Sequence, residues 1–232
     1  MNAPDPRYFT PTRSGASTPT GVLRLFHHGQ ILRRYSFEIA LEGFQIAKQK
    51  IPQLEFDIYG DGEDKYISEL QAYINTHNLQ DSVRFHDRVP VEQVPHLIEQ
   101  AHIGIVPCKK DIFVDKVMLP VRLLEYVAMN VPTIISRVGT VESYFTDEEV
   151  AYYPHNNAQA LADQIITLHN NPDKCQALVS KAKRAFQNHT WARQKETYYG
   201  VIDTLLGREK HMTTPASHST PKTETQLEKT TL

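Results

Sequence analysis

Pro120 and Glu125 belong to a stretch whose residue types could bind an anion and a sugar hydroxyl side by side. Proline suits the first helical position, because its missing N–H costs nothing there, so we predict that Pro120 opens a helix. The amides of Val121 and Arg122 then lack intrahelical partners, and free amides at a helix start attract anions. Glu125 lies four residues after Val121 and three after Arg122, so it shares their face. This arrangement suits a nucleotide.

The chain around this stretch alternates between short apolar runs and helical stretches from Val22 onward. Such alternation is typical of repeated β-α-β units and predicts an α/β domain with one Rossmann-like parallel sheet of about six strands and helices on both faces. The strands are predicted at 22–27, 54–58, 83–85, 103–106, 131–136 and 150–153. Ser36 and Asn157 are predicted to cap helices, and two last helices should run to about residue 206.

The two ends of the chain differ in composition from this predicted domain, 22–206. Residues 1–21 are rich in Pro, Ser, Thr and Gly and lack periodicity, which predicts a linker. Residues 207–232 contain almost no apolar side chains and are predicted to be disordered. The length of 232 residues allows one domain with a sizeable core.

Composition and charge exclude several classes of partner. The formal net charge of -2, from 25 Lys and Arg against 27 Asp and Glu, gives no general attraction to nucleic acid or to an anionic membrane. No segment approaches the ~20 apolar residues of a membrane span. The two cysteines, Cys108 and Cys175, have no disulfide or metal spacing. We therefore expect a cytoplasmic protein, with the inner membrane surface reached only through a partner.

The run from Leu119 to Pro132 resembles the motif Leu-Pro-x-Lys-Leu-x-Glu-Tyr-x-Ala-x-Gly-x-Pro of group 1 (family 4) retaining glycosyltransferases. In the two-domain GT-B fold of that family, the motif belongs to the C-terminal, donor-binding domain. The resemblance implies that residues 22–206 form a nucleotide-sugar-binding domain. It also implies that the helix start, from Leu119 through Pro120 and Val121 to Arg122, holds the nucleotide diphosphate and that Glu125 binds ribose hydroxyls.

Three positions depart from the family pattern. Arg122 stands where lysine is usual, and arginine keeps the charge. Asn130 replaces a glycine, and asparagine tolerates the left-handed conformation better than most residues. Val117 occupies the position of an earlier glutamate that many members carry, which makes contacts to the donor sugar less defined than contacts to the nucleotide.

Ligands of open parallel sheets bind beyond the carboxyl ends of the strands, so the turns after the first strands are candidate sites. Gly29 and Arg34 resemble the family's histidine-glycine turn and the basic residue that contacts donor phosphates. A guanidinium at Arg34 could stabilise the charge on a departing diphosphate, which would be a catalytic role. The alternative is that Arg33 and Arg34 form a solvated pair before a helix. Ser36 stands where the family usually has glycine.

Two further turns are weaker candidates. Gly60 and Gly62 resemble the family's Gly-x-Gly turn, in which glycine lets the backbone approach a ligand, although Asp-Gly is also common in plain turns. Arg88 follows the third strand at a place that faces the base in relatives, although a purely structural role is as plausible. The eleven histidines show no metal-binding spacing, so neither a metal nor another cofactor is expected.

These features together predict half of an enzyme. We expect a hexosyl group to pass, with retention, from a UDP-, GDP- or ADP-linked sugar to a glycan or lipid-linked acceptor. Residues 2–9 resemble the start of the crossing between the two family domains, so a separately encoded N-terminal glycosyltransferase domain is an expected partner. The alternatives are a truncated or non-catalytic nucleotide-sugar-binding module that acts through a partner protein, and another doubly wound nucleotide or effector binder.

Overall fold

The computed structural model describes residues 3–19 and 21–208. A first unit extends to Gln194 and contains the whole sheet, and a second unit begins at Lys195. Residues 3–19 form turns, bends and irregular backbone without a helix or a strand. The predicted disordered tail lies outside the described residues from position 209 onward.

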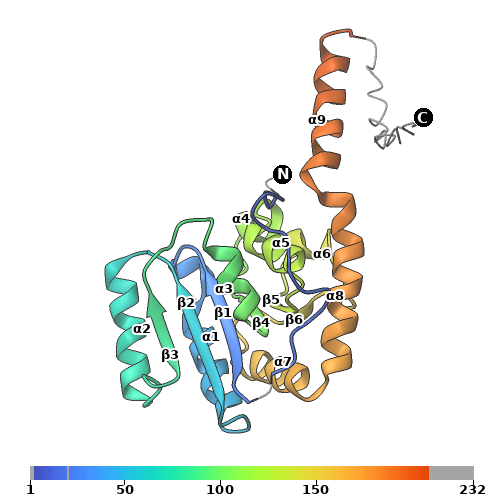
Figure 1. Ribbon diagram of the computed structural model, residues 1–232. Helices are drawn as coiled ribbons and strands as arrows, with labels where there is room; N and C mark the ends of the chain where they lie inside the picture. The colour runs from blue at the N-terminus through green and yellow to red at the C-terminus, as the bar shows by residue number, and fades with distance from the viewer. Residues whose placement is uncertain (1–2, 20, 209–232) are drawn as a thin grey trace, which may run out of the picture. The chain divides into compact units, whose positions relative to one another are not determined.

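Six parallel strands form one sheet in the order β3-β2-β1-β4-β5-β6, which confirms the predicted fold class (Figure 1). The strands are β1 (Leu23–His28), β2 (Leu54–Tyr59), β3 (Val83–His86), β4 (Ile103–Val106), β5 (Thr133–Ser136) and β6 (Ala151–Tyr153). The direction in which successive strands are added reverses between β1 and β4: β2 and β3 follow β1 on one side, and β5 and β6 follow β4 on the other. Doubly wound sheets bind their ligands at such a reversal, beyond the carboxyl ends of the strands.

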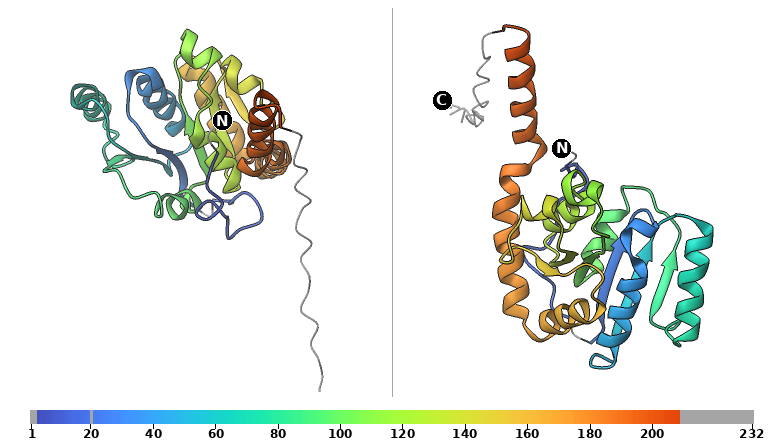
Figure 2. Two further views of the ribbon diagram at one scale, coloured as in Figure 1. Left: turned by 90° about the horizontal axis from the view of Figure 1, so that it is seen from above. Right: turned by 180° about the vertical axis from the view of Figure 1, so that it is seen from behind.

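Helices lie on both faces of the central strands (Figure 2). In chain order the described helices are η1 (Arg33–Tyr35), α1 (Phe37–Lys48), α2 (Asp64–Thr76), α3 (Val94–Gln100), α4 (Ile112–Lys116), α5 (Val121–Ala128), α6 (Gly139–Glu142), α7 (Ala158–Asn170), α8 (Pro172–Phe186), η2 (Gln187–His189) and α9 (Trp191–Leu205). None of these helices combines the length and the apolar character needed to cross a membrane.

The packing of α1 shows how the sequence builds these layers. Phe37, Leu41 and Phe44 recur at helical spacing and have no exposed surface, so one face of the helix enters the core. Gly43 allows α7 to approach closely, since a Cβ there would lie 2.8 Å from Leu161 Cδ2. Asn157 caps α7 as predicted, with its side chain accepting a hydrogen bond from Ala160 N at 2.9 Å.

Ser36 does not cap α1 with its side chain, and this prediction was wrong. Its backbone is left-handed, with φ 44° and ψ 51°, because Ser36 also ends η1, where its N–H donates to Arg33 O. An N-cap residue that accepts a hydrogen bond normally has an extended backbone. The Ser36 side chain is buried instead, and within the described chain its hydroxyl has no hydrogen-bond partner.

Two short helices, α4 and α6, were not predicted from the sequence. Asp111 caps α4 by accepting a hydrogen bond from Val114 N at 2.8 Å. Asp115 lies in α4, and its carboxylate accepts a hydrogen bond from Gly139 N at 2.7 Å, at the start of α6. A tertiary hydrogen bond therefore connects two segments whose local sequence is too short to show a helical period.

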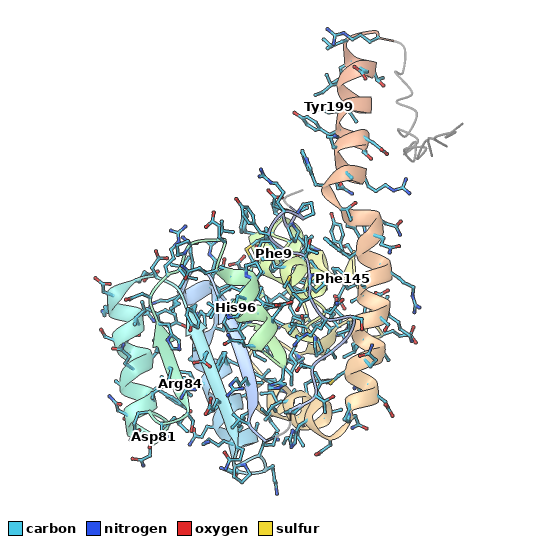
Figure 3. The ribbon with its side chains drawn as sticks, in the orientation of Figure 1. Phe9, Asp81, Arg84, His96, Phe145 and Tyr199 are labelled. Carbon is cyan, nitrogen blue, oxygen red and sulfur yellow. The ribbon has the colours of Figure 1, made fainter. Side chains whose placement is uncertain are left out.

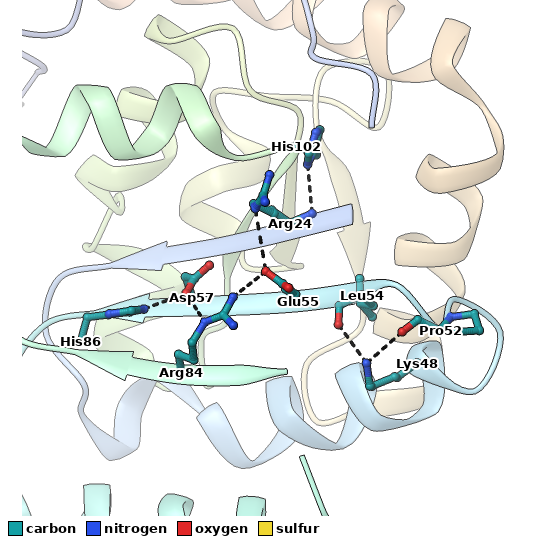
Figure 4. A network of polar contacts seen from close by, with 9 residues as sticks. All are labelled: Arg24, Lys48, Pro52, Leu54, Glu55, Asp57, Arg84, His86 and His102. Carbon is teal, nitrogen blue, oxygen red and sulfur yellow. Dashed lines mark hydrogen bonds and ion pairs between the residues drawn. The ribbon is translucent and has the colours of Figure 1, made fainter. Parts of the chain in front are cut away.

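One face of β2 and β3 carries charged side chains in place of apolar ones (Figure 4). Arg84 donates to Glu55 at 2.5 Å and to Asp57 at 3.1 Å, and Arg24 lies 3.8 Å from Glu55. His86 Nε2 lies 2.7 Å from the Asp57 carboxylate. These side chains are partly exposed, and β2 accordingly alternates between buried and half-buried residues.

Candidate functional site

A cavity of about 400 Å³ opens at the carboxyl ends of β1, β2 and β3. Its polar wall comes from four segments and contains His28, Gly29, Gly60, Asp61, Arg88 and Glu125. Its apolar wall includes Phe9, Tyr59, Val89 and Val94. A concave site of this size, in which apolar walls meet a few convergent polar groups, is typical of small-molecule binding sites.

Glu125 is the acidic group of α5 that faces this cavity. Its carboxylate Oε2 lies 3.2 Å from Nε2 of His28, and the two side chains are only 14% and 11% exposed. The two groups are not aligned for a hydrogen bond, and Nε2 of His28 has no hydrogen-bond partner in the described chain. The carboxylate and the imidazole therefore both retain hydrogen-bonding capacity for a ligand.

The start of α5 differs by one residue from the prediction. Pro120 is the N-cap, with an extended backbone at φ -65° and ψ 116°, and the helix begins at Val121. The predicted free amides are present, because nothing in the described residues accepts a hydrogen bond from the N–H of Val121 or Arg122. Leu119 and Val121 line a second hollow of about 580 Å³ that shares no lining residue with the Glu125 cavity.

Arg122 does not line the Glu125 cavity, contrary to the shared face that helical spacing predicted. Its Nη1 donates to Nε2 of His27 at 2.5 Å, and its guanidinium carbon lies 4.5 Å from the centroid of the Tyr35 ring. A Cβ on Gly29 would lie 3.0 Å from Nη2 of Arg122, so the guanidinium lies directly behind the Gly29 turn. Arg122 therefore braces the turn that forms the cavity wall.

The glycines after β1 and β2 allow two turns to touch. A Cβ on Gly60 would lie 1.8 Å from the carbonyl oxygen of Gly29, and a Cβ on Gly62 would lie 2.0 Å from that of Ile31. Gly29 itself has φ 108°, which favours glycine. Gly29 and Gly60 line the cavity, whereas Gly62 does not and packs against the backbone of Ile31.

The two candidate arginines in loops occupy different places. Arg88 is exposed, lines the cavity and lies 3.8 Å from Asp61, so it could reach a ligand at the entrance. Arg34 is exposed but lines neither hollow, and its guanidinium carbon lies 5.4 Å from the centroid of the Phe113 ring. Arg88 therefore lines the same cavity as Glu125, and Arg34 lies outside it.

Of the residues that line the cavity, sequence reasoning selected Gly29, Gly60, Arg88 and Glu125. His28, Tyr59 and Phe9 are among those it missed. His28 is the nearest charged or titratable neighbour of Glu125, and its position before Gly29 was the only signal available. Tyr59 ends β2, and its face of the strand could not be assigned from a single sequence. Phe9 belongs to the linker, whose composition gave no indication of a site.

Comparison with known proteins establishes the class of protein. The family described as "Glycosyl transferases group 1" matches residues 13–185. Because this match covers most of the chain, the protein belongs to the group 1 glycosyltransferases.

Two relatives are similar over most of the described chain. The amylovoran biosynthesis glycosyltransferase AmsK of Erwinia amylovora is 24% identical over 177 residues, and the putative colanic acid biosynthesis glycosyltransferase WcaL of Escherichia coli (strain K12) is 21% identical over 172 residues. These matches cover 74% and 73% of this chain but only 43% and 42% of the relatives. The chain thus spans less than half the length of either relative.

Solved structures show the same fold. The C-terminal domain of a group 1 glycosyl transferase, LpcC of Francisella tularensis, matches with a TM-score of 0.69 at 15% identity and covers 82% of this chain and 100% of its own. Anabaena HepE in complex with UDP and glucose matches with a TM-score of 0.69 at 16% identity, over 79% of this chain and 49% of its own. The fold is therefore that of a GT-B C-terminal domain.

Proposed function

We propose that this chain is the donor-binding half of a retaining glycosyltransferase. In this proposal it transfers a hexosyl group from a nucleotide diphosphate sugar to a glycan or lipid-linked acceptor. One observation carries the proposal: the largely buried Glu125 carboxylate faces a cavity of about 400 Å³ and has no side-chain hydrogen bond within the described residues. Such a carboxylate can accept hydrogen bonds from the two hydroxyls of a ribose. The presence of UDP in the HepE structure supports a nucleotide as the ligand.

The diphosphate has two candidate partners, the start of α5 and Arg34. In this proposal the free amides of Val121 and Arg122 receive phosphate oxygens, since a helix start favours anions. Arg34 stabilises the charge that builds up on the departing diphosphate, which requires its side chain to turn from Phe113 toward the donor. No divalent metal takes part in this proposal, because arginine and the helix start supply the positive charge.

The acceptor is proposed to bind to a second domain of N-terminal type. A cleft between two domains can position both reactants and exclude water, which one domain cannot do alone. The names of AmsK and WcaL refer to amylovoran and colanic acid biosynthesis, and they support a polysaccharide or its lipid-linked precursor as the acceptor.

Calorimetric titration of the purified chain with UDP, GDP and ADP tests the donor site. One of the three should bind, and addition of EDTA should leave its affinity unchanged. At ~100 times its Kd, the ligand should raise the free energy of unfolding by roughly 2.7 kcal/mol. Glu125→Gln should weaken binding by about tenfold or more, because hydrogen bonds to a charged group are lost. Glu42→Gln makes the same charge change on the exposed face of α1 and should have no effect.

The outcomes separate the candidate functions. Failure of all three nucleotides to bind, or equal affinity of the Glu125→Gln variant, would contradict the proposed donor site. Binding without hydrolysis or transfer, in the presence of a co-expressed N-terminal-type domain, would favour the non-catalytic module. If the donor sugar is released, the anomer that NMR detects first should keep the configuration of the donor.

A further inference from the structure

Phe9 brings the linker, residues 3–19, into the wall of the cavity that Glu125 faces. The Phe9 side chain is 7% exposed and packs against the hydrophobic core, beyond the carboxyl ends of the strands (Figure 3). Its neighbours in the linker behave differently, since Tyr8 is half-buried and Thr10 is exposed, and neither lines the cavity. One linker side chain is therefore built into a site whose other walls come from the ends of the strands, the turns that follow them, α3 and α5.

Hydrogen bonds hold the Phe9 ring in place from both sides. Upstream, the N–H groups of Tyr8 and Phe9 donate to Asp5 O at 3.0 and 2.9 Å and close a tight turn. Downstream, N and Oγ1 of Thr12 donate to the Glu99 carboxylate at 2.6 and 2.7 Å. A ring fixed in this way loses little conformational entropy when a ligand contacts it.

Tyr59 supplies a second fixed ring to the same cavity. The Tyr59 ring stacks on His86, with a centroid separation of 4.1 Å and an interplanar angle of 12°. His86 is held in turn by Asp57, whose carboxylate lies 2.7 Å from Nε2 of His86. Val89 and Val94 complete this apolar part of the wall. The cavity thus joins an apolar, aromatic region to the carboxylate of α5.

We propose that the base of a nucleoside diphosphate binds against Phe9 and Tyr59 while its ribose reaches Glu125. This inference rests on the proposed donor site and adds a residue of the linker to it. Heteroaromatic bases stack on aromatic side chains whatever the base, so Phe9 contributes affinity more than base selection. Because the base contacts the linker, bound nucleotide also stabilises the turn from Asp5 to Phe9.

A matched pair of variants in the full chain tests this inference. Phe9→Leu keeps a buried apolar side chain but removes the ring, and Tyr8→Leu removes a ring that does not line the cavity. With the best binder among UDP, GDP and ADP, Phe9→Leu should raise the Kd by about tenfold, whereas Tyr8→Leu should stay within about twofold of the unsubstituted chain. Phe9→Tyr keeps the ring and should restore most of the affinity. Nucleotide should also slow hydrogen exchange at the amides of Tyr8 and Phe9.

The binding results for these variants distinguish an error in this inference from an error in the proposed donor site. If Glu125→Gln weakens binding but Phe9→Leu does not, the base does not contact Phe9 and the donor site stands. If Phe9→Leu and Tyr8→Leu weaken binding equally, or if Phe9→Tyr fails to restore it, a general loosening of the linker explains the loss and the inference is overturned. If no nucleotide binds the unsubstituted chain, the donor site fails and the inference fails with it.

Discussion

Nη1 of Arg122 donates a hydrogen bond of 2.5 Å to Nε2 of His27, whose side chain has no exposed surface. The His27 ring keeps its proton on Nδ1, which donates to Ile105 O at 2.9 Å, so Nε2 is free to accept. Burial, and then the nearby Arg122 charge, hold the pKa of His27 well below its usual value, so the ring stays neutral. This pair joins the end of β1 to the start of α5, the two segments that contribute His28 and Glu125.

Replacing Arg122 by the family's usual lysine should destabilise this chain. A lysine cannot both donate to Nε2 of His27 and lie flat on the Tyr35 ring, because its charge is a single point on a flexible stem. We expect Arg122→Lys to lower the free energy of unfolding by about 1–2 kcal/mol in urea denaturation. Arg88→Lys makes the same change at an exposed side chain and should stay within about 0.5 kcal/mol. Equal effects would refute the bracing role of Arg122.

Glycine at position 36 should stabilise the chain. Ser36 carries both a left-handed backbone and a buried hydroxyl without a partner in the described residues, and Ser36→Gly removes both costs. We expect a gain of about 1 kcal/mol in the free energy of unfolding, with Ser36→Ala recovering only the part due to the hydroxyl. Thermal denaturation of the two variants would measure the difference. A loss on Ser36→Gly would show that the hydroxyl has a hydrogen-bond partner.

Replacing Asn130 by glycine should lower the free energy of unfolding, in contrast to the gain expected for Ser36→Gly. Asn130 is also left-handed, with φ 58°, but its buried Nδ2 donates to Arg13 O in the linker at 2.6 Å. Asn130→Gly removes the strain of the left-handed backbone, but it also removes the hydrogen-bond donor of the Arg13 carbonyl. We expect a net loss of about 1 kcal/mol, together with faster cleavage of the linker in limited proteolysis. A stability equal to that of the original chain would mean that this hydrogen bond contributes little.

The contact between the turns after β1 and β2 should not tolerate a methyl group. In Gly60→Ala the new Cβ would lie 1.8 Å from the backbone oxygen of Gly29, and in Gly62→Ala 2.0 Å from that of Ile31. Backbone cannot move aside as a side chain does, so each variant should lose at least about 3 kcal/mol of unfolding free energy. Gly21→Ala is the control, since nothing lies within 4 Å of its Cβ. Chemical denaturation that finds all three variants equally stable would exclude the close approach.

Acid should destabilise the fold through His102. Burial, and then the charges of Arg24 and Arg13, lower the pKa of His102 from 6.5 to about 4, and its Nδ1 accepts a hydrogen bond from Arg24 N at 3.0 Å. Between about pH 6.5 and pH 4 the unfolded chain binds this proton and the folded chain does not. Stability is therefore complete above pH 6.5 and falls as the pH drops to 4, by up to about 3 kcal/mol from this group.

Two histidine variants isolate that contribution. His102→Asn keeps an acceptor for Arg24 N but does not titrate, so its unfolding free energy should depend less steeply on pH between 4 and 6.5. His155→Asn, at an exposed histidine, should leave the slope unchanged. Identical slopes for all three proteins would assign the acid sensitivity to other groups, of which the buried His27 is the first candidate.

Local sequence patterns predicted most of the strands and helices, but not the conformations and contacts of several single residues. The six strands were predicted within one or two residues, and the helix start at Asn157 was predicted from this residue and the apolar spacing that follows it. The conformation of Ser36 was misjudged because a turn decided it. The helices α4 and α6 were not predicted, because a long-range hydrogen bond connects them and neither shows a helical period. Gly62 was taken for a ligand contact, whereas its lack of a side chain serves the packing of two turns.

The sequence by itself determined the class of fold, the family and the position of Glu125, because periodicity and a contiguous motif depend on neighbouring residues. Only the tertiary structure decided which side chains share a cavity. Arg122 lies on the helix face expected to meet the ligand, yet it turns to His27, since a partly buried guanidinium requires an acceptor. Phe9 reaches Glu125's cavity from a linker with no site signal, because loop closure and burial of an aromatic ring are properties of the folded chain.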